Sequence, residues 1–357
     1  MIDRICHIGP ALNVQGGISS VLVSYKKLFN LSDEHFLSSY NGSFLKSLPR
    51  LFFVCLKLLF GSHKRFEFYQ IHTSSYGSFF RKFLISLCLR CRRQKYTVHV
   101  HGSQFKKFCS KSPKLVRYFI RNYFNCASAV ICITPDMKEF LITFLKNEKL
   151  LFFIVPNPCQ TISSMPVDLE THELPVKIVF SGRFGKRKGV YDLINAFNQA
   201  QFQVPVELHL FGDGEIEQVK EEVAKSHKAQ SIYVSNWLPH KEYLKRLPSF
   251  DFLVLPSYAE TFGMSLVEAM GYGLPVIATF ADGIPFVVEN QKNGFLNKPG
   301  DVDALIRTIE ILAHDKSLRV QMGKNAWEDA LKKFKGNIIL SLLNNIYTEP
   351  LLAMKKC

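Results

Sequence analysis

Acidic residues are scarce in the first 150 residues of this 357-residue chain. That segment holds 23 Lys and Arg against 7 Asp and Glu, a net charge of +16, whereas residues 151–357 hold 22 against 23, a net charge of −1. Between Lys57 and Arg121 only one acid, Glu67, accompanies fifteen basic residues. One alternative is a plain solubilising face, but such surfaces mix both signs. The imbalance favours an anionic partner, a phospholipid surface more than nucleic acid, because no nucleic-acid recognition module is visible.

Long apolar runs are also absent. No stretch of about 18 uninterrupted apolar residues occurs, so we expect no segment that spans a bilayer; the best candidate, residues 51–60, contains Lys57. The first residues do not have the pattern of a signal peptide, and nine cysteines without such a signal favour a reducing, cytoplasmic compartment. Cys88 and Cys91 form a CxxC without a second Cys or His pair at zinc spacing, so we interpret them as residues of a helix face and predict no metal.

Strand and helix patterns alternate through both halves of the chain, which predicts parallel sheets covered on both faces. Predicted strands cover residues 4–8, 66–72, 96–101, 129–133, 152–155, 176–182, 206–212, 231–235, 251–257 and 274–279. Predicted helices cover residues 19–29, 77–91, 135–145, 190–200, 215–226 and 338–354. We therefore predict an α/β fold of two Rossmann-like domains that face each other across a cleft, with ligands bound outside the carboxyl ends of the strands.

A proline-rich segment separates the two predicted domains. Residues 156–175 contain four prolines and several turn-forming residues, as in a linker. The predicted boundaries are 1–160 for the N-terminal domain, 161–337 for the C-terminal domain, and 338–357 for a terminal helix that packs back toward the first domain.

The stretch PSYAETFGMSLVEAMGYGLPVIA (256–278) carries the strongest chemical signal. Glu260 and Glu268 lie eight residues apart, about two helical turns, so both carboxylates could face one cleft. A helix that starts between them offers free N–H groups and a positive dipole end to a diphosphate, and Gly263 allows close approach of a ligand. On position alone, Glu260 could equally be a neighbour of a helix cap, and Glu268 an ordinary exposed helix residue.

The ordered set of motifs resembles the family 4 glycosyltransferases, which have the two-Rossmann GT-B fold. It comprises NVQGGIS (13–19), VHG (100–102), VICITPDMKEFL (130–141), VPNP (155–158), SGRFGKRKG (181–189), HLFGDGE (209–215), the E-x7-E stretch, and DGIPFVVENQKNGFL (282–296) followed by GDVDAL (300–305). Two positions depart from the family pattern. Phe286 stands where many members have an acid in GGxPE, and PNP (156–158) stands where many have PNG.

The resemblance implies a role for each matching residue. Arg183 and Lys188 would clamp the diphosphate, Glu260 would contact the donor sugar, Glu268 would bind the ribose, and His101 would contact the sugar. His72 is a weaker candidate on the acceptor side, and Lys186 and Arg187 are interpreted as surface charge. Further donor-binding residues would be Gly16 and Gly17 in a glycine loop, Gly182, Trp237 and Leu238 near the base, and Phe262, Gly263, Met264 and Ser265 through their backbone amides.

The resemblance also implies a reaction. It is retaining transfer of a sugar from a nucleoside-diphosphate-sugar, UDP by preference, with no cofactor and no metal, to a lipid-linked saccharide in bacterial lipopolysaccharide, O-antigen or capsular polysaccharide assembly. The protein would be cytoplasmic and bind the inner face of the membrane through its basic half. Alternatives left open are a nucleotide-sugar epimerase or a phosphorylase on the same fold, and a non-catalytic nucleotide- or nucleic-acid-binding protein.

Overall fold

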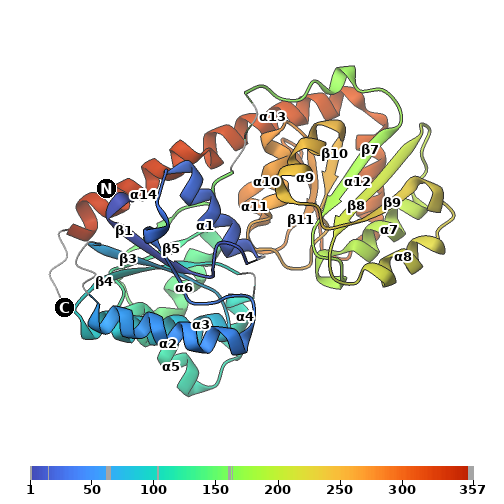
Figure 1. The fold of residues 1–357 in the computed structure, drawn as a ribbon. Helices are drawn as coiled ribbons and strands as arrows, with labels where there is room; N and C mark the ends of the chain where they lie inside the picture. Colours follow the sequence, from blue (N-terminus) through green and yellow to red (C-terminus); the bar gives the residue numbers. More distant parts are fainter. Residues whose placement is uncertain are drawn as a thin grey trace. The chain divides into compact units, whose positions relative to one another are not determined.

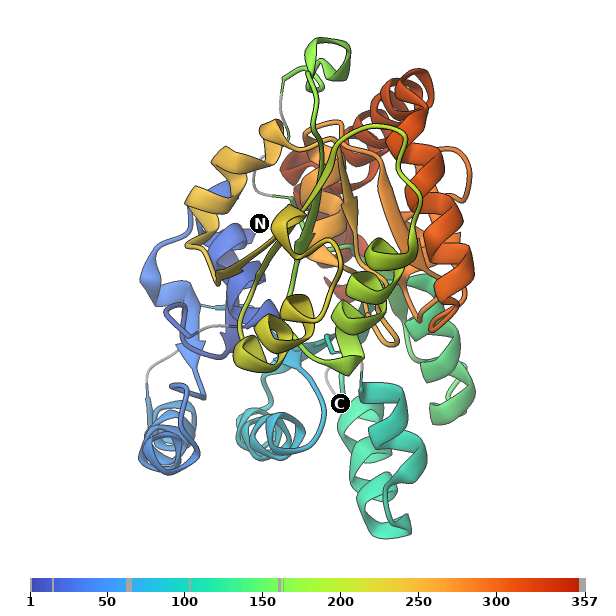
Figure 2. The same ribbon diagram turned by 90° about the vertical axis from the view of Figure 1, so that its right-hand side faces the viewer.

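The computed structural model describes residues 2–14, 16–61, 66–102, 104–159, 162 and 164–352, without the side chains of residues 44–46 and 349–352. The chain divides into two compact units: unit 1 comprises Met1–Gln160 and Gly336–Cys357, and unit 2 comprises Thr161–Lys335. Each unit is built on a six-stranded, wholly parallel sheet with helices on both faces (Figures 1 and 2). The predicted fold class, two Rossmann-like α/β domains, is confirmed.

The sheet of unit 1 has the strand order β2-β1-β3-β4-β5-β6. Its strands are β1 (Ile5–Gly9), β2 (Phe36–Ser38), β3 (Phe68–Thr73), β4 (Lys95–Val100), β5 (Ala129–Cys132) and β6 (Phe152–Ile154). Its helices are α1 (Gly17–Leu28), α2 (Phe44–Phe60), α3 (Gly77–Cys91), α4 (Phe105–Lys111), α5 (Lys114–Asn125), α6 (Pro135–Leu145) and α14 (Gly336–Leu352). Strand β2 and helices α2, α4 and α5 are not among the predicted elements.

The two faces of this sheet pack against different helices, because successive side chains of a strand point to opposite faces. One face, with Tyr69, Ile71 and Val98, forms a core with α2 to α6. The other face, with Ile5 and Phe68, forms a core with α1 and α14. Figure 1 shows α2, α3 and α5 on the side of the sheet away from α14.

Helix α14 returns the chain to unit 1 through an apolar stripe. Ile339, Leu343, Ile346 and Tyr347 recur at helical spacing, and all four are buried against the sheet and α1. At the start of the helix, a Cβ on Gly336 would come within 2.9 Å of Leu28 in α1, so glycine permits this close approach. Helix α14 is thus an integral part of the unit 1 core.

The sheet of unit 2 has the order β12-β11-β10-β7-β8-β9. Its strands are β7 (Val176–Ser181), β8 (Val206–Gly212), β9 (Ile232–Asn236), β10 (Phe252–Val254), β11 (Val276–Thr279) and β12 (Gly294–Asn297). Its helices are α7 (Val190–Gln199), α8 (Ile216–Ala224), α9 (His240–Arg246), α10 (Met264–Gly271), α11 (Ile284–Val287), α12 (Val302–His314) and α13 (Lys316–Phe334).

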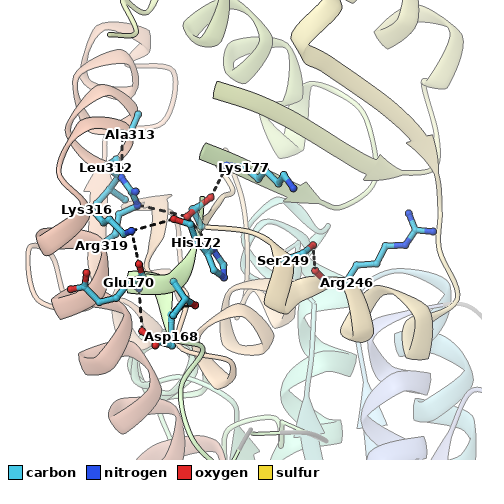
Figure 3. Close-up of polar contacts among 12 residues, drawn as sticks. Asp168, Glu170, His172, Lys177, Arg246, Ser249, Leu312, Ala313, Lys316 and Arg319 are labelled. Atoms are coloured by element: carbon cyan, nitrogen blue, oxygen red, sulfur yellow. Dashed lines mark hydrogen bonds and ion pairs between the residues drawn. The ribbon is translucent and has the colours of Figure 1, made fainter. Parts of the chain in front are cut away.

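The proline-rich segment is anchored to unit 2 where it reaches β7 (Figure 3). Lys316 of α13 donates to the carbonyls of Glu170 and His172, at 2.6 and 3.2 Å. Buried Asp251 accepts from the backbone N–H of Lys177 at 2.7 Å and contacts His172 Nδ1 at 3.2 Å. These bonds tie residues 169–177 to the sheet and to the α12–α13 layer.

The helices of the described residues include none with the length and hydropathy that crossing a bilayer requires.

The Tyr347 hydroxyl provides a test of how α14 is held. It lies 2.7 Å from Thr97 Oγ1 and donates to Gln70 Oε1 at 3.1 Å, both on the buried sheet face. Replacing Tyr347 by Phe leaves these groups short of a partner, so we expect the free energy of unfolding to fall by about 1–3 kcal/mol. Tyr233→Phe, at an exposed site in unit 2, is the control and should change it by less than about 0.5 kcal/mol. Equal losses in the two variants, measured by urea denaturation, would contradict this account.

Candidate functional site

Three loops of unit 2 meet at the carboxyl edge of its sheet, because β10, β7 and β8 are neighbours and parallel. They are residues 182–189, 212–215 and 255–263, here called the unit 2 rim. Backbone bonds join them: the Phe184 N–H donates to the Asp213 carbonyl at 2.6 Å, and the Tyr258 N–H donates to the Arg187 carbonyl at 2.9 Å. The rim therefore brings together residues far apart in the sequence, among them the predicted Gly182, Arg183, Lys188 and Glu260.

An ion pair between Lys188 and Glu260 lies at the centre of the unit 2 rim. Both side chains are largely buried, with exposed fractions of 16% and 14%. Burial alone would raise the pKa of the Glu260 carboxyl, but the Lys188 ammonium, through its charge and its hydrogen bond, holds that pKa below its usual value. Arg187 and the backbone N–H of Phe262 act in the same direction. Arg187 also donates to the Ala259 carbonyl at 3.3 Å, so it contributes to the rim as well as to the surface.

Arg183 is an exposed cation of the unit 2 rim, as are Lys186 and Arg187. Its side chain lies over Gly214, where an added Cβ would come within 3.1 Å of Arg183 Cγ and 3.4 Å of Nε. No ion pair to its guanidinium is found among the residues that the structure describes. A guanidinium in this position is available to a diphosphate, which it can bind through two parallel hydrogen bonds.

Helix α10 begins at the unit 2 rim and supplies backbone donors. Gly263 precedes it with φ of 75°, and a Cβ there would come within 2.7 Å of Leu266, so glycine is required at this turn. The N–H groups of Met264 and Ser265, in the first turn, have no partner within the helix. Phe262, by contrast, turns its ring into the core against Phe334 and gives its N–H to Glu260.

Glu268 lies on α10 with 8% exposure, and it has a hydrogen-bond partner that the sequence analysis did not predict. Its Oε1 is 2.8 Å from His240 Nε2, at the start of α9. His240 follows the loop that holds the predicted residues Trp237, which is half exposed, and Leu238, which is partly buried. Proximity to that loop in the sequence is the signal that could have indicated His240.

In unit 1, the predicted glycines and His101 follow β1 and β4 at the carboxyl edge of the sheet, with β3 between these strands. Gly16 has φ of 153° and caps α1, and a Cβ on Gly16 or Gly17 would meet no atom within 4 Å. The space around this loop is therefore open to a ligand.

A hollow of about 750 Å³ adjoins the residues that follow β1 and β2. Its lining includes Asn13, Tyr40, Asn41 and Arg50, which supply polar donors and acceptors. None of the four was predicted as a site residue. Asn13 lies in the quoted motif NVQGGIS, and the other three follow β2 or lie in α2, two elements that the sequence patterns did not predict.

Beside this hollow, Lys82 of α3 is fully buried and donates to Ser39 Oγ at 2.6 Å. Burial, with a smaller contribution from the charge of Arg81, lowers the pKa of Lys82 to about 7.

Four imidazoles occupy the sheet face beneath α1: His7, His72, His99 and His101. His7 Nδ1 is 3.2 Å from His72 Nε2, and His72 Nδ1 is 3.0 Å from His101 Nε2. Burial lowers the pKa of His7 and of His101 to about 3 and that of the other two well below the usual value. All four are therefore neutral at pH 7.

These features define a class of protein. Two Rossmann-like units, one of which carries cations, a helix start and buried carboxylates at its carboxyl edge, constitute the GT-B glycosyltransferase architecture. The crystal structure of Anabaena HepE in complex with UDP has the same fold, with a TM-score of 0.75, 18% identity, and coverage of 96% of this chain and 99% of that one.

Residues 165–329 match the family model described as glycosyl transferases group 1, so this part of the chain is similar to that family. Similar proteins include the sulfoquinovosyl transferase SQD2 of Arabidopsis thaliana, 33% identical over 43% of this chain. The capsular polysaccharide biosynthesis glycosyltransferase CapM of Staphylococcus aureus is 27% identical over 62% of this chain. The chain spans 30% of the length of the first and 62% of the second.

Acidification should destabilise unit 1 through its imidazoles. Their pKa values are lowered in the folded state, so the unfolded chain binds protons first as the pH falls. The contribution of these histidines to the free energy of unfolding is therefore fully present above about pH 6.5. It decreases as the pH falls from there toward 3. Each such histidine adds a slope of about 1.4 kcal/mol per pH unit in that window.

Urea titrations between pH 7 and pH 5 measure this slope. His7→Phe should reduce it by about 1.4 kcal/mol per pH unit, because one site of proton uptake is removed. An unchanged slope would show that the pKa of His7 is the same in the folded protein as in the unfolded chain.

Proposed function

We propose that the protein is a retaining glycosyltransferase that moves a sugar from a nucleoside-diphosphate donor, UDP by preference, to a lipid-linked saccharide. The observation that carries the proposal is the unit 2 rim, where Arg183, the Lys188–Glu260 pair and the first turn of α10 converge. The match of residues 165–329 to the group 1 family model and the UDP complex of HepE support a nucleotide-sugar donor. They do not favour the epimerase, phosphorylase or nucleic-acid-binding alternatives.

The donor diphosphate would be held without a metal. Arg183 and Lys188 supply positive charge, and the free N–H groups of Met264 and Ser265 add the positive end of a helix. As the bond from sugar to phosphate breaks, negative charge builds on the leaving diphosphate, and these fixed donors stabilise it. The leaving phosphate oxygen takes the proton of the incoming hydroxyl on the same face of the sugar, which retains the configuration.

Two carboxylates would orient the donor and would not attack it. Glu260 is kept ionised beside Lys188, so it accepts hydrogen bonds from sugar hydroxyls. Glu268 would accept from the ribose hydroxyls in exchange for His240. Phe286 is partly exposed and packs near Phe334, at the position where the family pattern has an acid, and it offers no polar contact to the donor.

The acceptor would be presented at a membrane surface. Helix α2 leaves Leu48, Phe52, Phe53, Leu56 and Phe60 exposed, with Phe60 at 80%. Neighbouring α3 exposes Phe80 and Leu84, and α5 exposes Leu115 and Tyr118. These side chains lie on the helix layer that carries most of the excess Lys and Arg of the chain, a combination that suits an anionic lipid surface. We propose that unit 1 docks on the inner face of the cytoplasmic membrane in surface-polysaccharide assembly, the process named for CapM.

Arg183→Ala tests the proposed chemistry. Removing one transition-state donor should lower the rate of sugar transfer about 10²- to 10³-fold. The melting temperature should stay the same, because the side chain is exposed. Lys186→Ala, an exposed cation of the same loop, is the matched control and should keep the wild-type rate. Release of nucleoside diphosphate, measured with and without a chelator, gives the readout. Full activity of the Arg183 variant, or strict dependence on Mg²⁺ or Mn²⁺, would overturn the proposal.

A second experiment tests the membrane surface. The triple variant Phe52→Ser, Phe53→Ser and Phe60→Ser should bind vesicles of phosphatidylglycerol and phosphatidylethanolamine at least about tenfold more weakly, because three large apolar side chains no longer enter the lipid. The control replaces exposed apolar residues of unit 2, Met165, Leu174 and Ile311, by Ser and should bind as the wild type does. Co-sedimentation measures both; equal binding by all three proteins would exclude this surface.

A further inference from the structure

The buried imidazoles of unit 1 form a connected chain. His7 on β1, His72 on β3 and His101 after β4 lie on adjacent strands, with nitrogen–nitrogen distances of 3.2 and 3.0 Å. His7 and His72 are fully buried, whereas His101 retains 4% exposure at the carboxyl edge of the sheet. The chain thus runs from the interior to the edge where a ligand would bind.

Each neutral imidazole has one N–H donor and one bare nitrogen, so the tautomers along such a chain are coupled. If His7 Nδ1 donates to His72 Nε2, then His72 Nδ1 must carry its proton and donate to His101 Nε2. The proton of His101 then lies on Nδ1. The opposite direction would place protons on the Nε2 atoms of all three rings.

The environment of His7, at the interior end of the row of imidazoles, decides between these two directions of hydrogen bonding. His7 Nε2 is buried without a hydrogen-bond partner among the described residues, and the ring lies between Phe36, stacked at 5.5 Å, and Tyr25, edge-on at 5.4 Å. A buried N–H without an acceptor is rarer in proteins than a buried acceptor without a donor. The arrangement that leaves His7 Nε2 unprotonated is therefore the more stable one.

We propose that His7 and His72 are positioning residues that fix His101 as a hydrogen-bond donor. His72 occupies His101 Nε2, so Nδ1–H is the group left to meet a sugar or acceptor oxygen at the carboxyl edge of unit 1. The tautomer of His101 follows from the structure alone; only the identity of the oxygen that it meets rests on the proposed function.

The charges around the row of imidazoles agree with a role of His101 as a hydrogen-bond donor. Burial is the main cause of the lowered pKa of each imidazole, and the neighbouring charges that act on them are Lys82 and other histidines, not a carboxylate. A general base would instead need a partner that stabilises its protonated form. The front-face reaction requires no such base, since the leaving phosphate takes the proton.

A three-histidine metal site is the competing explanation. One nitrogen each from His72, His99 and His101 lies within 4.8 Å of the others, and His99 Nε2 has no hydrogen-bond partner in the described part of the chain. However, a ligand nitrogen must present a lone pair to the ion. At 3.0 Å, His72 Nδ1 and His101 Nε2 share one proton in a hydrogen bond, which uses the lone pair that one of them would give.

Nitrogen NMR of the full-length protein labelled with ¹⁵N-histidine tests the proposal without any need for turnover. We expect His101 to carry its proton on Nδ1 in the wild type. In His7→Phe, the new ring suits the aromatic surroundings, but His72 Nε2 no longer receives a hydrogen bond from His7. His72 can then carry its proton on either nitrogen, so His101 should also populate the Nε2–H form. Transfer by that variant should fall about tenfold through kcat. Phe36→Leu, which alters the packing around His7 but removes no nitrogen, should keep the wild-type tautomer.

Three results would overturn the proposal: a proton on His101 Nε2 in the wild type, a tautomer unchanged in His7→Phe, or one equivalent of a tightly held transition metal in the purified protein. The wild-type spectrum alone decides the first, even where the variant does not fold. The expected tautomers in a protein that transfers no sugar would support the chain of imidazoles and refute the proposed function.

Discussion

All the strands of each sheet run in the same direction, and the candidate chemistry of this protein depends on that constraint. Parallel strands end together, so the loops that follow β7, β8 and β10 meet although the ends of these strands lie about 30 to 70 residues apart in the sequence. The same rule gathers the residues after β1, β2 and β4 in unit 1. Strands that are buried on both faces leave the carboxyl edges as the place where polar side chains can meet a ligand.

Charge at the unit 2 rim is balanced and not merely positive. Lys188 neutralises Glu260 in a largely buried pair, whereas Arg183 stays exposed. A buried cation alone would carry a large desolvation cost, and so would a buried carboxylate alone; in the pair, each group offsets part of the cost of the other. The excess charge of the chain lies elsewhere, on the helices of unit 1 that also expose phenylalanine and leucine. The two kinds of positive charge therefore suit two kinds of anion, a diphosphate and a lipid surface.

One face of the unit 1 sheet carries buried polar side chains, which lower the stability of the unit. The face under α1 and α14 contains Gln70, Thr97 and four imidazoles, where a parallel sheet ordinarily has branched apolar residues. Tyr347 of α14 satisfies Gln70 and Thr97, which links the last helix to the same polar row. Polar groups at this depth are stable only when hydrogen-bonded. Burying these polar side chains lowers stability, but the hydrogen bonds between them fix the orientation of each one.

The amino-acid sequence by itself determined the two α/β units, because alternating strand and helix patterns and glycine-bounded loops are local properties. It also determined where the E-x7-E segment lies along the chain and the charge difference between the halves, whereas the structure places Glu260 in a loop and only Glu268 on α10. Only the tertiary structure decided that Lys188 pairs with Glu260, that His240 faces Glu268, and that three histidines from β1, β3 and the end of β4 form one chain. It also decided that the amphipathic α2 leaves apolar side chains such as Phe52, Phe53 and Phe60 uncovered. Each of these depends on which strands are neighbours and on what covers a helix, and pairing between distant segments leaves no periodic signal along the chain.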